Sequence, residues 1–134
     1  MNEELVYEAS ILKQEAEKLQ ANLETIERQI SELGQISGYL SHLNKYEGKE
    51  IISSLGKGIH IKTQLLEKNL FVEVGSGAIV RKTPEETLKV IEEQLKRLME
   101  FKVQLSGQEQ VCMQALNSAI SEIQKQSASN KTNP

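Results

Sequence analysis

The sequence has no tryptophan, one cysteine, two prolines and only 4% aromatic residues in 134 positions. Hydrophobic residues make up 38% of the chain, so large side chains to fill a globular core are scarce. The charged fraction of 26% favours long amphipathic helices instead. The single cysteine, Cys112, cannot form a disulfide within the chain, and we expect one domain in the reducing environment of the cytoplasm.

Further absences limit the function. The net charge of −3 argues against a nucleic-acid partner, which usually binds a basic patch. No apolar run is long enough to span a bilayer, and the first residues lack the pattern of a signal peptide, so we expect no membrane partner. His42 and His60 lack neighbours at metal-ligand spacing, and Cys112 lacks a nearby histidine. We therefore expect no metal, no cofactor, no catalytic residue and no enzymatic activity.

Two stretches, from about residue 3 to 45 and from about 84 to 126, carry apolar residues at alternating spacings of three and four. This heptad pattern predicts two coiled-coil helices with a left-handed supercoil. The predicted seam of the first helix is Leu5, Ala9, Leu12, Ala16, Leu19, Leu23, Ile26, Ile30, Leu33, Ser37 and Leu40. That of the second is Leu88, Ile91, Leu95, Leu98, Lys102, Leu105, Glu109, Cys112, Leu116, Ala119 and Ile123.

The two seams have equal length, so an antiparallel pair would place Leu40 opposite Leu88 and Leu5 opposite Ile123. Thr83-Pro84-Glu85-Glu86 has the residue types of a helix N-terminus, with threonine as the cap and proline at the first helical position. The polar segment 127–134 is expected to be disordered.

Between the helices, the segment 50–82 contains an internal repeat. Leu55-Gly-Lys-Gly-Ile-His-Ile-Lys62 recurs as Val74-Gly-Ser-Gly-Ala-Ile-Val-Arg81. Glycine tolerates positive φ, and β-branched residues flank each Gly-x-Gly, so we expect two β-hairpins that turn at these glycines. A phosphate-binding loop is disfavoured, because a strand pattern and not a helix follows each Gly-x-Gly. Unpaired hairpin edges would favour assembly with other subunits.

Several apolar residues lie off the seam near the free ends of the helices, including Val6, Tyr7, Ile11, Val111 and Met113. Exposed apolar surface often marks an interaction site. These residues could also pack against one another or against a fixed partner. Met99, Phe101 and Val103 are off the seam too, and the heptad pattern gives no reason for them.

The chain resembles the α class of the prefoldin family. The resemblance rests on the first glycine repeat and on Phe71-Val-Glu-Val-Gly-Ser-Gly-Ala-Ile-Val-Arg-Lys-Thr-Pro-Glu-Glu86, which lie between two heptad helices of equal length. The two hairpins also match the α class. The resemblance implies a mainly α fold with a small β insert. In this fold a long antiparallel coiled coil is joined by two β-hairpins, which oligomerise into a β-barrel body.

The same resemblance implies a cytoplasmic heterohexamer in which two α-class subunits, one being another copy of this chain, assemble with four β-class subunits. It further implies an ATP-independent holdase that binds unfolded client proteins at its coiled-coil tips and delivers them to a group II chaperonin. The alternative is a structural or filament-forming coiled-coil scaffold without client transfer. The expected client-binding residues are Leu5, Val6, Tyr7, Ile11, Val111, Met113, Leu116 and Ile120. The expected oligomerisation residues are Ile51, Ile52, Leu55, Ile59, Ile61, Phe71, Val72, Val74, Ile79 and Val80.

Overall fold

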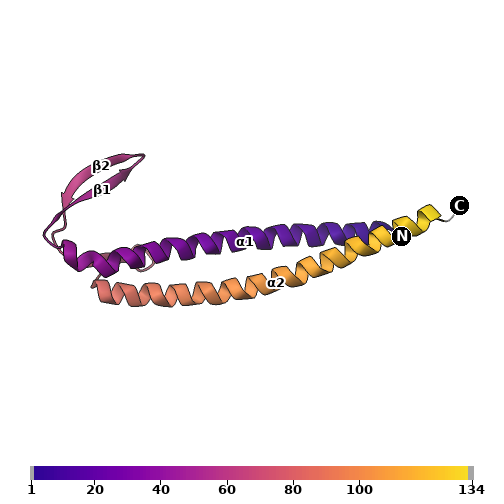
Figure 1. The fold of residues 1–134 in the computed structure, drawn as a ribbon. Coiled ribbons are helices and arrows are strands. Elements are labelled where there is room, and N and C mark those ends of the chain that lie inside the picture. Colours follow the sequence, from indigo (N-terminus) through magenta and orange to yellow (C-terminus); the bar gives the residue numbers. More distant parts are fainter. Residues whose placement is uncertain (1, 133–134) are drawn as a thin grey trace. The chain divides into compact units, whose positions relative to one another are not determined.

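The structure, a computed structural model, describes residues 2–132 (Figure 1). Its elements in chain order are α1 (Asn2–His42), a 3₁₀ turn (Leu43–Tyr46), β1 (Glu50–Gly56), β2 (Ile59–Gln64), β3 (Leu70–Glu73), β4 (Ile79–Lys82) and α2 (Pro84–Thr132). The chain divides into two compact units. We call 2–29 with 98–132 the helix-pair unit and 30–97 the hairpin unit. The long helices, the two hairpins and their order agree with the predicted fold class.

The burial pattern of α1 follows the predicted seam. Every seam residue from Leu5 to Leu40 is buried or half-buried, and the other residues of α1 from Glu3 onward are exposed. On α2 the eleven predicted seam residues are likewise buried or half-buried, and so are Pro84, Thr87, Val90 and Gln126. The seven-residue pattern therefore predicted the core of both helices correctly, because only a side chain that returns to the same helix face every two turns stays against a partner.

Within the helix-pair unit the two helices run antiparallel. Cys112 Sγ donates a hydrogen bond to the carbonyl oxygen of Leu12 at 3.3 Å, and Lys102 Nζ lies 3.6 Å from Glu27 Oε1. Residue numbers thus fall along α1 as they rise along α2, as predicted. The polar seam position Lys102 is stabilised by reaching this carboxylate beside the buried Ile26.

In the hairpin unit, α2 begins at the predicted N-cap. The backbone N–H of Glu86 donates to Thr83 Oγ1 at 3.1 Å. The Thr87 N–H and hydroxyl both donate to the Thr83 carbonyl oxygen, at 3.0 and 2.9 Å. Pro84 is fully buried at the first helical position. The bond from Glu86 satisfies one of the backbone donors that a helix start otherwise leaves without partners, and the bond from the Thr87 N–H is the first regular bond of the helix.

The two hairpins close with the same backbone geometry. Strand β1 pairs antiparallel with β2, and β3 pairs antiparallel with β4. In the first turn Lys57 and Gly58 have φ of 51° and 78°, and in the second Ser76 and Gly77 have 51° and 77°. Positive φ at both central residues is the type I′ pattern, which matches the twist of hairpin strands. The repeated Gly-x-Gly of the sequence is therefore a repeated turn.

The C-terminal end of α2 differs from the expectation. A disordered tail was predicted from residue 127, yet α2 continues to Thr132; residues 133–134 of that predicted tail lie outside the described residues. The segment Ser127-Ala-Ser-Asn-Lys-Thr132 is polar but contains neither glycine nor proline, so nothing in it stops a helix that has already formed. Polarity alone was a poor signal for the helix end. At its own end, α1 gives way to the 3₁₀ turn, and Gly48 follows with a φ of 78°.

Candidate interaction surfaces

The helix-pair unit exposes most of the apolar residues that the sequence singled out. Val6, Tyr7, Ile11 and Val111 are 52%, 70%, 48% and 68% exposed. Met113 and Ile120 are exposed to a lesser degree. These six side chains are therefore accessible to a partner in this structure, although an isolated apolar residue on a surface is common and carries little meaning by itself.

Two members of the predicted client-binding set belong to the seam. Leu116 is buried and Leu5 is half-buried, because both occupy heptad positions that face the other helix. Leu116 packs in the seam and also lines a groove beside it, so its place in the client-binding set stays a prediction. Cys112 is buried in the same seam, in agreement with its predicted role as a small core residue.

The exposed apolar residues do not form one patch, because the seam separates two grooves. The Met113 groove has an apolar part and a charged part. Its apolar residues are Ala16, Ala21, Met113 and Leu116, and its charged residues are Lys13, Glu17, Glu24 and Glu109. The Val111 groove runs along the other flank of the seam. Its residues include Leu12, Glu15, Leu19, Gly107, Val111 and Ala115.

Helical periodicity assigns the remaining residues to these flanks. Ile120 lies seven residues from Met113, and Val6 lies seven from Lys13, so both belong to the flank of the Met113 groove. Ile11 lies four residues before Glu15 and belongs to the flank of the Val111 groove. Tyr7 is on the surface opposite the seam.

The same periodicity also assigns Met99, Phe101 and Val103, which the seam did not explain, to the two flanks. Met99 precedes Met113 by two heptads and Val103 precedes it by ten residues, so both continue its flank along α2. Phe101 precedes Val111 by ten residues and continues the other flank. All three are at least half exposed. The heptad seam missed this signal, which appears only when the positions beside the seam are read as rows of their own.

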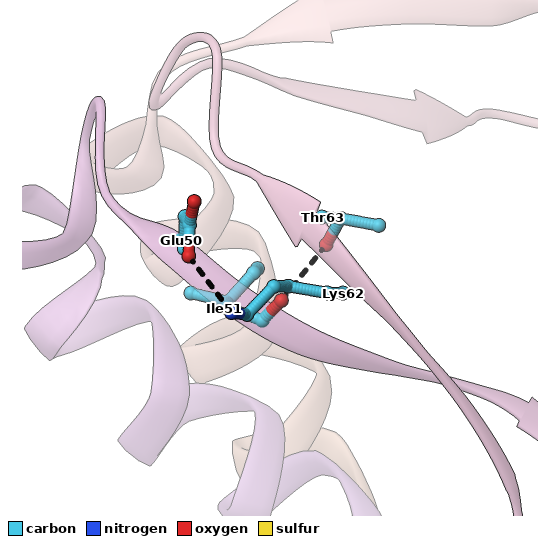
Figure 2. A network of polar contacts seen from close by, with 4 residues as sticks. All are labelled: Glu50, Ile51, Lys62 and Thr63. Atoms are coloured by element: carbon cyan, nitrogen blue, oxygen red, sulfur yellow. Dashed lines mark hydrogen bonds and ion pairs between the residues drawn. The ribbon is translucent and has the colours of Figure 1, made fainter.

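The hairpin unit presents a second group of apolar residues. On β1 and β2, Ile51, Ile59 and Ile61 share a face, while Ile52 lies on the other face with the Glu50–Lys62 ion pair of 3.3 Å. Figure 2 shows this pair next to the hydrogen bond that Thr63 Oγ1 donates to the Ile51 carbonyl oxygen at 3.4 Å. The first face therefore carries more apolar surface than the second.

The second hairpin carries apolar residues on both faces. Val72 and Val80 share one face, and Phe71 and Ile79 share the other. Of the ten predicted oligomerisation residues, Ile51 and Val72 are half-buried and the other eight are exposed. Each hairpin forms a sheet of two strands, so each described strand keeps one edge without a ladder partner. Such edges are the positions at which other chains add strands.

A pocket in the hairpin unit is lined by Tyr39, His42, Leu43, Tyr46, Ile51 and Leu65. It lies where the end of α1 and the 3₁₀ turn meet the first hairpin. The pocket therefore places the two tyrosines near the end of α1 beside the first hairpin. The contact is partial, since Tyr39 and Tyr46 remain exposed.

Among residues 2–132, no group of three or more His, Cys, Asp or Glu side chains is arranged to hold a metal ion. Neither described helix has an apolar stretch long enough to cross a membrane. The side-chain nitrogen and oxygen atoms that are buried in the described part of the chain all have hydrogen-bond partners.

Comparison with known proteins agrees with this architecture. Residues 12–129 match the family model for a prefoldin subunit. The chain is 33% identical over 97 residues to prefoldin subunit alpha of Pyrococcus horikoshii, and 31% identical over 96 residues to prefoldin subunit alpha 1 of Thermococcus kodakarensis. Each alignment covers 70% of this chain and 66% of the relative, so the chain spans just under two thirds of the curated relatives it matches.

Among solved structures, the chain is similar to that of filamentous PFD from Methanocaldococcus jannaschii, determined by cryo-EM. The TM-score is 0.70 at 24% sequence identity, and the match covers 90% of this chain and 98% of the other. This similarity supports the fold of two long helices joined by hairpins. Since the family model covers most of the sequence and the fold agrees with it, the chain belongs to the prefoldin family.

Proposed function

We propose that this chain is an α-class subunit of a cytoplasmic prefoldin heterohexamer, two α with four β subunits, that acts as an ATP-independent holdase. The observation that carries the proposal is the exposed apolar side chains on both flanks of the helix-pair unit, more than a two-helix coil needs for its own seam. Burial of apolar surface contributes roughly 25 cal/mol per Å², so small grooves bind an unfolded segment weakly. Several subunits acting on one client would supply avidity.

The hairpin unit carries assembly in this proposal. Its exposed apolar faces and free strand edges would associate with the hairpins of β-class subunits and of a second copy of this chain, and together they would close a β-barrel body. Delivery of the client to a group II chaperonin completes the proposed function. The chemistry is non-covalent throughout, so the protein would act without catalytic residues or cofactors.

Aggregation of a chemically unfolded test protein, followed by light scattering, tests the holdase. The complex of this chain with co-purifying β-class subunits is compared with the same complex carrying Val6→Ser, Ile11→Ser, Val111→Ser and Met113→Ser. We expect the substitutions to reduce suppression of aggregation. The control is Ile36→Ser, which removes an exposed apolar residue of α1 in the other unit.

The alternative function is a scaffold that assembles through its hairpins and binds no client. The exposed apolar residues of the hairpin unit would serve it equally well. Full suppression of aggregation by the four-residue variant would refute the proposed binding surface. An assembled complex that suppresses no aggregation at all would favour the scaffold.

A further inference from the structure

We propose that the Met113 groove selects client segments in which a short apolar run is flanked by lysine or arginine. The proposal rests on the holdase function and names the kind of segment that this subunit would prefer. It arises from the charges around the groove. Three carboxylates and one ammonium group surround its apolar part: Glu17, Glu24, Glu109 and Lys13.

The carboxylates of this groove are free to accept a partner. Within the part of the chain that the structure describes, Glu17, Glu24 and Glu109 form no ion pair with a lysine or arginine. By contrast, the nearby Glu27 already binds Lys102 at 3.6 Å. A cationic side chain entering the groove therefore gains an interaction without displacing one. An anionic side chain would meet three like charges and one opposite charge.

The spacing of the carboxylates suits an extended chain. Glu17 and Glu24 are two helical turns apart on α1, which corresponds to about 10 Å along the helix axis. An extended peptide rises about 3.3 Å per residue, so two basic residues that bracket a run of about two apolar residues match this distance. Met113, an adaptable side chain, lies at the apolar part of the groove and can contact different residues of that run.

The other flank provides an internal comparison. The Val111 groove has one charged residue, Glu15, next to mostly apolar ones. Charge selection is therefore expected at the Met113 groove and not at the Val111 groove. A second copy of this coil is a poor occupant of the Met113 groove, because its own charged flank would bring carboxylates against carboxylates. An unfolded client with basic residues beside apolar ones is the complementary partner.

Three fluorescent peptides test the preference against the complete complex of this chain with β-class subunits. All contain the same pair of apolar residues, flanked by lysine, by serine or by glutamate, and fluorescence anisotropy gives their dissociation constants at low and high salt. A surface charge pair changes affinity by roughly 1.5- to 5-fold. We expect the lysine peptide to bind about 5- to 10-fold more tightly than the glutamate peptide at low salt. High salt should reduce the difference.

Substitutions assign the preference to the groove. In Glu17→Gln/Glu24→Gln/Glu109→Gln the lysine and glutamate peptides should bind almost equally. The matched control, Glu8→Gln/Glu100→Gln/Glu122→Gln, removes the same total charge from exposed positions outside both grooves and should keep the preference. Circular dichroism of each complex checks that the helices remain folded.

The possible outcomes separate this inference from the holdase proposal. No preference in the unmodified complex, a preference that survives the groove substitutions, or an equal loss in the control variant would each overturn charge selection. If the complex suppresses aggregation but shows one of these results, only the selectivity is refuted. If it neither suppresses aggregation nor binds any of the peptides, the holdase function fails as well.

Discussion

Replacing glycine by alanine should have opposite effects in the helices and in the turns of this protein. Gly34, Gly38 and Gly107 are exposed helical residues, and a Cβ added to any of them would meet no atom within 4 Å. Glycine in a helix interior is about 0.8–1 kcal/mol less favourable than alanine, so each substitution should stabilise the fold by that amount. The triple variant should gain about 2–3 kcal/mol if the sites are independent.

The opposite sign is expected at the turns. A Cβ at Gly58 or Gly77 also meets no atom within 4 Å, so space is not the obstacle. Both residues have φ near 78°, however, where an alanine costs roughly 1–2 kcal/mol. Gly77→Ala therefore serves as the matched counterpart of Gly107→Ala, since the change in side chain is the same and only the backbone conformation differs.

Thermal unfolding followed by circular dichroism at 222 nm measures both effects. Each variant is compared with the unmodified chain at one protein concentration, because association shifts the apparent stability. A gain of 1 kcal/mol should raise the midpoint by roughly 3–6 °C for a chain of this size, and the turn variant should lower it by a similar amount. A helix variant that melts earlier, or a turn variant that melts later, would refute the assignment of these glycines.

Three further predictions follow from single residues. Leu116→Ala should destabilise the chain by about 2–5 kcal/mol because it removes buried seam contacts. Val111→Ala, one and a half turns away and exposed, should change stability by less than about 0.5 kcal/mol. Equal effects of the two substitutions in urea unfolding would contradict this placement of the seam. Thr83→Ala should cost about 1 kcal/mol by removing the cap of α2, and Thr83→Ser should retain most of it; a similar loss in both variants would show that the hydroxyl does not act as the cap. Ile61→Asp should lower the native mass of the assembled complex, because Ile61 lies on the more apolar face of the first hairpin. His60→Asp, on the other face, should leave the mass unchanged. An unchanged mass for Ile61→Asp would refute assembly through the face that carries Ile61.

Much of this fold could be predicted because its determinants are periodic. The residues from Leu5 to Leu40 alternate between buried and exposed as the heptad pattern requires, and Thr83-Pro84 fixes the start of α2 through local hydrogen bonds. Both kinds of signal lie within a few residues of the position they determine. The repeated Gly-x-Gly predicted the two turns for the same reason.

The less accurate predictions concern positions where no local signal decides. Leu116 is buried in the seam and also lines the Met113 groove, because the heptad pattern gives the helix face of a residue but not how the flanking grooves open onto its side chain. The separation of Met113 from Val111 by the seam was missed because apolar residues near the helix ends were grouped by sequence position and not by helix face. The extent of α2 beyond residue 126 depends on the balance between helix propensity and fraying, which composition does not resolve.

The unbroken seam also limits how this protein can change in length. An insertion or deletion of one residue in α1 would rotate every following side chain by about 100° and carry the seam away from the partner helix. A deletion of a whole heptad, such as 12–18 of α1, keeps the rotation but shifts the pairing with α2 unless 110–116 is removed as well. Viable shorter or longer forms of the helix pair are therefore separated by matched steps of seven residues in both helices, so that natural variation in this part of the chain should come in paired heptads.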